Sequence, residues 1–412
     1  MKFEFKLIFR QKLVLSALLL SMLFATIALW NGWSKIETIR QEISVAKQAE
    51  TLRFAQKIQH YGNGGLAGET GYYIFHTVYN TPAQWSFISL GNRNFSPHIQ
   101  RIRLLGLQAQ LYDGESHNPE YAVAGNFDFA FVVIFILPLF CIALAHDLCS
   151  IERNQNRLTL LQSLAAKPLQ FWAKRLLARW IIASMSIILP LVICVAYLQL
   201  HWSDCLNICL AVMLYALFWM VISGALSFYL SKPSTNAILC LNIWLLITIL
   251  IPNVASILIN QATPVIAGAE IALANRQKTH DAWDLPKQTT FDAFFREYPE
   301  WKDTPAVTGR FHYKWYFAFQ HVADLSVREA VQHREQALLQ RDANSRALGI
   351  VLPSVAMQYW LDDLAQNNLE NLLNYRQKIN QFHSQLREYF YPYLFNETPF
   401  NAADFQAMPK FQ

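Results

Sequence analysis

The residues best suited to interaction chemistry lie in a charged segment between two long apolar stretches. Glu152 and Arg153 open the segment, and Leu158 and Leu161 follow at a spacing that puts both on one face of a helix. Pro168 is expected to end that helix, because proline lacks a backbone donor and clashes with the preceding turn. A short amphipathic helix of this kind either lies on anionic lipid headgroups or docks on a partner protein.

The sequence lacks the patterns that mark common catalytic and metal sites. It has no G-x-x-x-x-G-K-[ST] loop to hold nucleotide phosphates, and no G-x-S-x-G, H-E-x-x-H or C-x-x-C pattern. Among eleven histidines, His98 and His117 come nearest to a metal pair, but no ligand spacing recurs. The basic residues form no aromatic-interleaved surface for nucleic acid. We therefore expect no catalytic residue, no metal, no bound cofactor and no nucleic-acid partner.

Five stretches are long and apolar enough to be transmembrane helices, which need about 20 residues to cross a core of about 30 Å. The composition agrees, since 53% of the chain is hydrophobic and only 15% is charged, against about a quarter charged in soluble domains. The first stretch is expected to be an uncleaved anchor, because no small-x-small cleavage site follows it. The predicted spans are Leu13 to Trp30, Phe127 to Ala145, Leu177 to Leu198, Leu206 to Leu230 and Asn236 to Leu258.

Charge orients these spans. The loops on one side carry +8 and those on the other side carry −2, so the positive-inside rule places the first set in the cytoplasm. The N-terminus is then cytoplasmic and the C-terminus extracytoplasmic. The positive set is 1–12, 147–179 and 231–235, and the other set is 31–126, 199–205 and 259–412.

Ionisable residues are scarce within the predicted spans. Asp128 stands at the outer start of the second span, and Pro138 in the same span can let the helix bend. These two residues are a possible gate, although Asp128 can also face interfacial water and Pro138 can be a tolerated bend. A proton-coupled transporter usually shows several ionisable groups in its spans, so energy for any transport is expected to come from elsewhere.

The predicted fold is an all-α integral membrane protein with about five transmembrane helices. Both large outer segments show helical spacing and contain no cysteine, so helix packing must hold them, and the glycines from Gly62 to Gly71 predict a loop. The divisions are 1–30 (cytoplasmic tail and first span), 31–126 (first extracytoplasmic domain), 127–258 (four spans with the cytoplasmic coupling segment 147–176) and 259–412 (second extracytoplasmic domain).

The charged segment resembles the E-R-E-x-G-T-L-x-L-L…P pattern of permease subunits in the type-2 ABC exporter (ABC-2) superfamily. Asn154, Asn156 and Arg157 depart from the usual Glu, Gly and Thr. The matching residues are Glu152, Arg153, Leu158, Leu160, Leu161 and Pro168. Other motifs are similar to one subgroup, which has two large extracytoplasmic segments and is related to gliding-motility and copper-maturation permeases. These motifs are Ser89-Leu90-Gly91, Pro97, Asn118-Pro119, Gly125, Phe127 to Phe131, Leu137-Pro138-Leu139, Tyr298-Pro299-Glu300, Leu352-Pro353-Ser354, Gln358 and Met408 to Phe411.

The resemblance implies an export permease in the bacterial inner membrane. It implies that Glu152, Arg153, Leu158, Leu161 and Pro168 couple this chain to a separate cytoplasmic ABC ATPase, which holds the ATP and Mg. It also implies a homodimer, or a heterodimer with a second permease, surrounded by membrane lipids. The sixth membrane helix that these permeases usually carry is absent from the 412 residues.

A second function class remains open. The chain fits a non-transporting membrane scaffold or sensor whose outer helical domains bind a partner, although it has only about 30 contiguous cytoplasmic residues between spans. The apolar composition of the spans suits lipid contact as well as an apolar substrate, so it does not specify what is moved.

Overall fold

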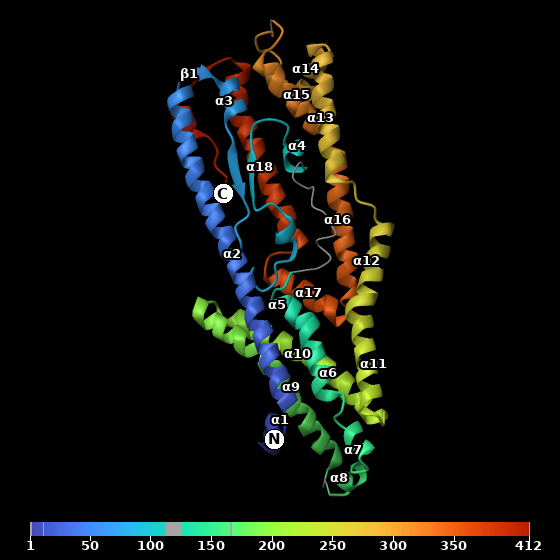
Figure 1. The fold of residues 1–412 in the computed structure, drawn as a ribbon. Helices are drawn as coiled ribbons and strands as arrows, with labels where there is room; N and C mark the ends of the chain where they lie inside the picture. The colour runs from blue at the N-terminus through green and yellow to red at the C-terminus, as the bar shows by residue number, and fades with distance from the viewer. Residues whose placement is uncertain (1, 11, 113–125, 165–166, 308, 412) are drawn as a thin grey trace.

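A computed structural model describes residues 2–10, 12–112, 126–164, 167–307 and 309–411 as an elongated assembly of helices (Figure 1). Five helices are long and apolar enough to cross a membrane, and each contains most or all of one predicted span, which confirms the helical membrane-protein character at this level. These candidate spans are Val14–Tyr61, Phe129–Asn154, Pro168–Leu198, Trp202–Tyr229 and Pro233–Ala262.

Twelve helical elements lie in the described parts of residues 2–61 and 126–262, and two of them, η3 and η4, are π-helical. They are α1 (Lys2–Arg10), α2 (Lys12–Tyr61), α5 (Phe129–Phe131), η3 (Val132–Ile136), α6 (Leu137–Ala145), α7 (Ser150–Asn154), α8 (Leu158–Leu164), α9 (Pro168–Leu198), α10 (Trp202–Tyr229), α11 (Pro233–Leu245), η4 (Leu246–Leu250) and α12 (Ile251–Ala262).

The rest of the described chain, residues 62–112, 263–307 and 309–411, forms what we call the head. Its elements are β1 (Asn63–Leu66), α3 (Ala67–Tyr73), β2 (His76–Tyr79), η1 (Gly91–Phe95), β3 (Ile99–Ile102), α4 (Leu107–Tyr112), α13 (Gly268–Asp284), α14 (Lys287–Glu297), η5 (Pro299–Trp301), α15 (Tyr313–Ser326), α16 (Arg328–Leu348), α17 (Pro353–Leu364), α18 (Leu369–Phe395), β4 (Pro399–Asn401) and α19 (Ala402–Ala407).

The first span does not stop at the edge of the apolar stretch. Helix α2 is 50 residues long in all and runs from the end of the structure that carries the N-terminus to the side of the head (Figure 1). At about 1.5 Å per residue it is about 75 Å long. The spacing of Ile36, Ile39 and Ile43 predicts this continuation, and all three side chains are buried.

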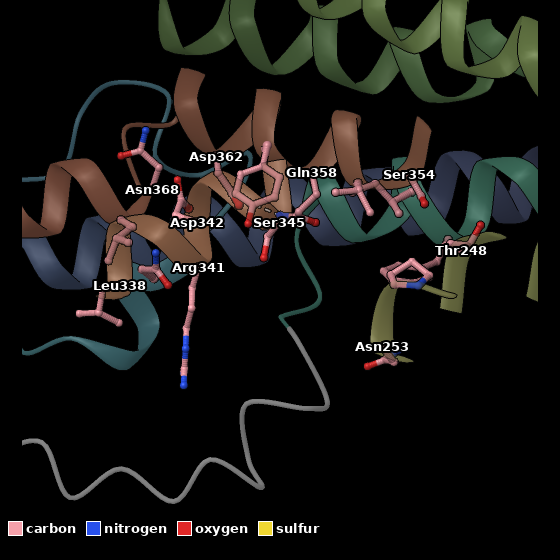
Figure 2. Close-up of a pocket in the computed structure, with 17 residues that line it drawn as sticks. Thr248, Asn253, Leu338, Arg341, Asp342, Ser345, Ser354, Gln358, Asp362 and Asn368 are labelled. Carbon is pink, nitrogen blue, oxygen red and sulfur yellow. Dashed lines mark hydrogen bonds between the residues drawn. The ribbon is translucent and has the colours of Figure 1, made fainter. Parts of the chain in front are cut away.

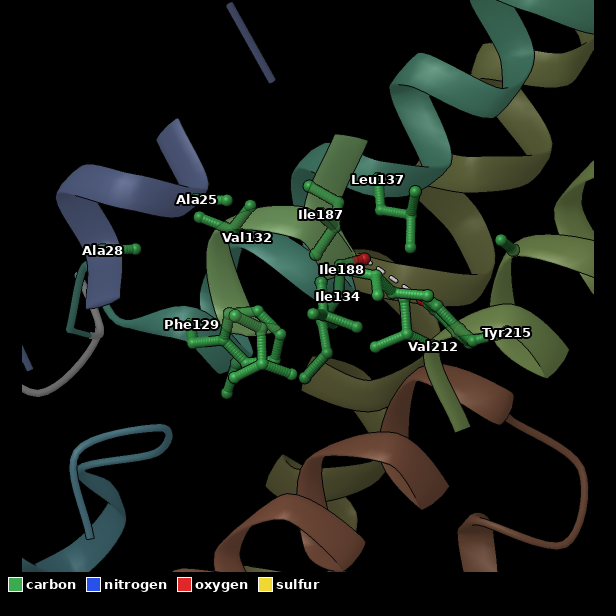
Figure 3. Packing of buried hydrophobic residues seen from close by; sticks show 14 of the residues in the cluster. Ala25, Ala28, Phe129, Val132, Ile134, Leu137, Ile187, Ile188, Val212 and Tyr215 are labelled. Carbon is green, nitrogen blue, oxygen red and sulfur yellow. Dashed lines mark hydrogen bonds between the residues drawn. The ribbon is translucent and has the colours of Figure 1, made fainter. Parts of the chain in front are cut away.

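Small and branched side chains bring the spans close together. Ala25 and Ala28 of α2 are fully buried beside Phe129 and Val132, as Figure 3 shows. The other spans contribute further buried residues to the same cluster, among them Ile187 of α9. Small residues at such contacts let helix backbones approach one another, which is how helices pack in a membrane.

The two outer segments share one hydrophobic core. Buried side chains from residues 61–112 pack with others from residues 271–408 in a single cluster. Asp324 joins the segments directly: its carboxylate accepts from the backbone amides of Leu107 (2.8 Å) and Gln108 (3.0 Å), from Asn275 (2.9 Å), and from Arg387 (2.6 Å). The two segments, predicted as separate domains, are therefore one packed unit in the structure.

The head also contains two short sheets that an all-α prediction omits. β1 pairs antiparallel with β4, and β2 pairs antiparallel with β3 in the register His76↔Ile102 to Tyr79↔Ile99. β1 falls in the glycine-rich stretch, so the prediction of a loop there is wrong. Gly68 lies in α3, where an added Cβ would stand 2.2 Å from the Tyr313 side chain, so this glycine permits close packing.

The three positively charged segments meet at one end of the structure, which we call the base. Glu4 of α1 forms an ion pair with Arg175 of α9 at 3.4 Å, and Asn236 of α11 donates a hydrogen bond to the carbonyl of His146. The turn between α9 and α10 lies against the head instead, since Trp85 donates to Asp204 at 3.0 Å. The loops between the spans thus lie in turn at the base and against the head, and which end faces the cytoplasm stays a prediction.

Candidate functional site

Helix α7, which carries Glu152 and Arg153, is held from both of its ends by α10. Ser227 accepts hydrogen bonds from the first amides of α7, those of Cys149 (2.8 Å) and Ser150 (3.0 Å). In return, the Arg153 guanidinium donates to the carbonyls of Phe228 (2.6 Å) and Leu230 (3.3 Å). A cation at the last carbonyls of a helix satisfies acceptors that have no partner within that helix. Helix α7 is thereby fixed to the end of the fourth span.

Glu152 is held by two arginines. Its carboxylate lies 3.0 Å from Arg157, which follows α7, and 3.4 Å from Arg175 of α9, and Arg175 also reaches Glu4. The side chains of Glu152 and Arg175 are each 12% exposed. Both predicted coupling charges are thus engaged inside this chain, where they position the segment.

The leucines of α8 point in two directions. Leu158 packs on the small buried cluster of Leu148, Cys149 and Trp172, and Leu161 is half-buried. Leu160 and Leu164, one helical turn apart, are 59% and 74% exposed at the end of the base.

Pro168 occupies a different place from the one expected. Leu164 is the last described residue of α8, and Pro168 is the first residue of α9, so the proline begins the next helix. Proline is well tolerated there, because the first amides of a helix have no partner within it. The next residue, Leu169, is 82% exposed, so it extends the apolar surface at the base.

Asp128 is a buried capping residue at the junction between head and spans. One carboxylate oxygen accepts from the amide of Phe131 (2.9 Å) at the start of α5, and the other accepts from the amide of Leu90 (2.9 Å) in the head. Burial raises the pKa of Asp128 to about 6, against the lowering effect of these amide hydrogen bonds. Asp128 therefore ties the start of the second span to the head, and its gating role stays a prediction.

Pro138 belongs to a feature that occurs twice. In the second span the π-helical η3 is followed by Leu137-Pro138, and in the fifth span the π-helical η4 is followed by Ile251-Pro252. Proline has no N–H to donate, so backbone carbonyls one turn earlier lose a partner. Tyr215 donates to the carbonyl of Ile134 (3.1 Å) in η3, and Ser354 donates to that of Ile247 (3.2 Å) in η4. Side chains from neighbouring helices thus donate hydrogen bonds to a backbone carbonyl in each of the two π-helical segments.

A pocket of about 510 Å³ lies between these two segments and the head. The spans contribute Ile134 and Phe135 of η3 and Thr248 of η4 on one side. Helices α16 and α17 contribute polar groups on the other, including Gln358 and Asp362 (Figure 2). π-Helical turns are rare and recur at functional sites, so a cavity lined by two of them is a candidate binding site.

The comparisons with known proteins reach only the second half of the head. The family described as "Domain of unknown function (DUF3526)" matches residues 269–412. This stretch covers α13 to α19 and includes the pocket side chains of α16 and α17. No curated protein and no solved structure shows a significant match.

Of the two histidines that come nearest to a metal pair in the sequence, only His98 lies in the described part of the chain. His98 lies 2.6 Å from the carboxylate of Glu42, while His117 falls outside the described residues, as do Asn118-Pro119 and Gly125 of the subgroup motifs. Within the described ranges no group of three or more His, Cys, Asp or Glu side chains is arranged to hold a metal ion.

Sequence reasoning missed the residues that place α7, and of those that line the pocket it named Ser354 and Gln358 only as motif residues, without a site. Ser227 and Arg175 are single polar residues near the ends of apolar stretches. The partners of Ser227 are 77 and 78 positions away in the chain, and Glu152 is 23 positions from Arg175. Asp362 gives no signal in the sequence beyond its charge. The exposure of Leu160 could have been found, because it lies off the face shared by Leu158 and Leu161.

Proposed function

We propose that this chain is the permease subunit of an ATP-driven exporter of the ABC-2 type, embedded in the bacterial inner membrane. In this proposal the base is cytoplasmic and the head is extracytoplasmic, as the charge pattern predicts. A separate ATPase subunit binds ATP and Mg, and two permease copies, or this chain and a second permease, form the pathway. The exporter class in this proposal is taken from the resemblance of residues 152–168 to permease subunits of the ABC-2 superfamily.

One observation carries the proposal: α8 presents unpartnered leucines on a support that is tied to several helices. Leu160 and Leu164 are exposed, whereas α7 is hydrogen-bonded to α10 and its Glu152 is paired with α9. A force applied to α8 would pass through Arg153 into α10 and through Leu158 and Trp172 into α9. This is what a coupling element needs, because a loosely attached helix would absorb the motion of its partner.

The test is whether this chain retains an ABC ATPase, and the probe is a P-loop ATPase encoded by a neighbouring gene; absence of such a gene would favour the scaffold. We expect the wild-type permease in nanodiscs to retain the ATPase, and L160E/L164E to lose it, because charged residues replace apolar contact area. Gln162→Glu is the matched control, since it adds a carboxylate at an exposed position of the same helix. Equal retention by all three permeases would reject α8 as the docking helix.

The alternative, a non-transporting scaffold or sensor, predicts a different result. It requires no ATPase on α8, so the wild-type protein would retain none. ATP hydrolysis by the purified complex, measured with and without the permease, separates the two functions further. Hydrolysis that does not depend on the permease would favour the scaffold.

A further inference from the structure

The pocket between head and spans has one apolar wall and one polar wall. Ile134, Phe135 and Pro252 of the second and fifth spans form the apolar part of one side, where Thr248 and Asn253 also line the pocket. A molecule bound there would touch the two spans on one side and the head on the other. The pocket volume of about 510 Å³ lies within the range of small-molecule sites.

The polar wall holds a carboxylate that no cation neutralises among the described residues. Oδ1 of Asp362 accepts from Ser89 and from Gln358 (3.0 Å), whereas Oδ2 receives no hydrogen bond in this part of the chain. The neighbouring acids differ: Arg346 pairs with Asp342 at 2.6 Å and with Asp363 at 2.7 Å. Asp362 therefore leaves one charged acceptor open toward the pocket.

The basic residue that lines the pocket does not compensate Asp362. Arg341 donates to the carbonyls of Thr263 (2.6 Å) and Asn260 (3.1 Å), and its side chain extends away from Asp362 in Figure 2. Asp128 adds a further negative charge behind the pocket and, after burial, helps to raise the pKa of Asp362 to about 6. At pH 7.5 Asp362 is therefore ionised, and the polar wall attracts cations.

We propose that this pocket binds an amphiphile that carries a protonated amine on a hydrocarbon portion. The amine donates to Asp362, and the hydrocarbon portion lies against Ile134, Phe135 and Pro252. An ammonium has three donors and no acceptor, which suits a site whose open group is a carboxylate. Binding at this site requires no ATPase and goes beyond the proposed transport function.

The test uses the full-length protein in phosphatidylcholine nanodiscs at pH 7.5. A photoreactive diazirine derivative of dodecylamine is the probe, and labelled peptides are mapped by mass spectrometry. We expect labelling within residues 246–253 and 338–369, at least tenfold above that by the matched derivatives of dodecanol and dodecanoic acid. Equal labelling by all three probes would overturn the proposal.

Two variants examine the pocket itself. Asp362→Asn keeps the size of the side chain but removes its charge, and we expect it to lower amine labelling at least tenfold. Ser345→Phe fills the pocket from α16 and is expected to have the same effect with an unchanged size-exclusion profile. The control is Asp363→Asn, since that neighbouring carboxylate already pairs with Arg346 and does not line the pocket. Full labelling of folded Asp362→Asn would refute the role of the carboxylate, whatever the result for the ATPase.

Discussion

Replacing Arg153 by methionine should release α7 and α8 from the bundle while leaving the rest of the fold in place. The guanidinium makes two hydrogen bonds to the carbonyls of Phe228 and Leu230 at the end of α10. Methionine retains much of the apolar stem of arginine but donates nothing. The variant therefore removes the bonds without opening a large cavity.

The expected size of the effect follows from the geometry. A hydrogen bond to a charged group contributes about 1.5–3 kcal/mol, and the 3.3 Å bond to Leu230 is the weaker of the two. The loss should be about 2–4 kcal/mol for local opening of α7. At about 1.4 kcal/mol per factor of ten, this corresponds to amide exchange about 30- to 700-fold faster.

Hydrogen exchange of the protein in nanodiscs measures this directly, on peptides that cover residues 147–164. Arg157→Met is the matched control, since the Arg157 side chain is 56% exposed and its one ion pair among the described residues is with Glu152. A surface ion pair contributes at most about 1 kcal/mol, so exchange should rise about fivefold or less. If Arg153→Met and Arg157→Met accelerate exchange equally, or if α18 responds as strongly as α7, the proposed anchoring is refuted.

Three other perturbations test the head and the spans. Asp324→Ala leaves the buried Arg387 without its carboxylate, and we expect the free energy of unfolding to fall by about 3–5 kcal/mol in denaturant titrations. Tyr215→Phe removes the side-chain hydrogen bond to the carbonyl of Ile134, and unfolding in mixed SDS micelles should show a loss of about 0.6–1.7 kcal/mol. The raised pKa of Asp362 means that its protonation stabilises the fold fully below the unfolded pKa and that this stability is lost as pH rises through about 6. The melting temperature of the wild type relative to Asp362→Asn should thus fall between pH 5 and 7.5, and a pH-independent difference would contradict it.

The spans were predictable because their signal is local. About 20 consecutive apolar residues suffice to identify a spanning helix, whatever the rest of the chain does. The continuation of α2 was predictable for the same reason, since Ile36, Ile39 and Ile43 lie within three turns. Both predictions thus depend only on residues that are close together in the sequence.

The head and the pocket depend on contacts between distant residues. Asp324 joins α4 from more than 200 positions away, and nothing near it in the sequence indicates these partners. The loop predicted around Gly68 was wrong because composition does not distinguish a glycine in a turn from one that makes room for Tyr313. At the base, the residue types of Glu152 and Arg153 were informative. The partners of Arg153, however, are backbone carbonyls, which every sequence contains.

The length of α2 turns a small rotation into a large displacement. Its first turns lie at the base, its middle packs in the spans, and its last turns contact the head, all on one uninterrupted helix. Over about 75 Å of helix, a tilt of about 5° at the base moves the far end by about 6 Å. A straight helix of this length would act as a lever arm, and would carry a tilt of the first span to the part of the head that it contacts.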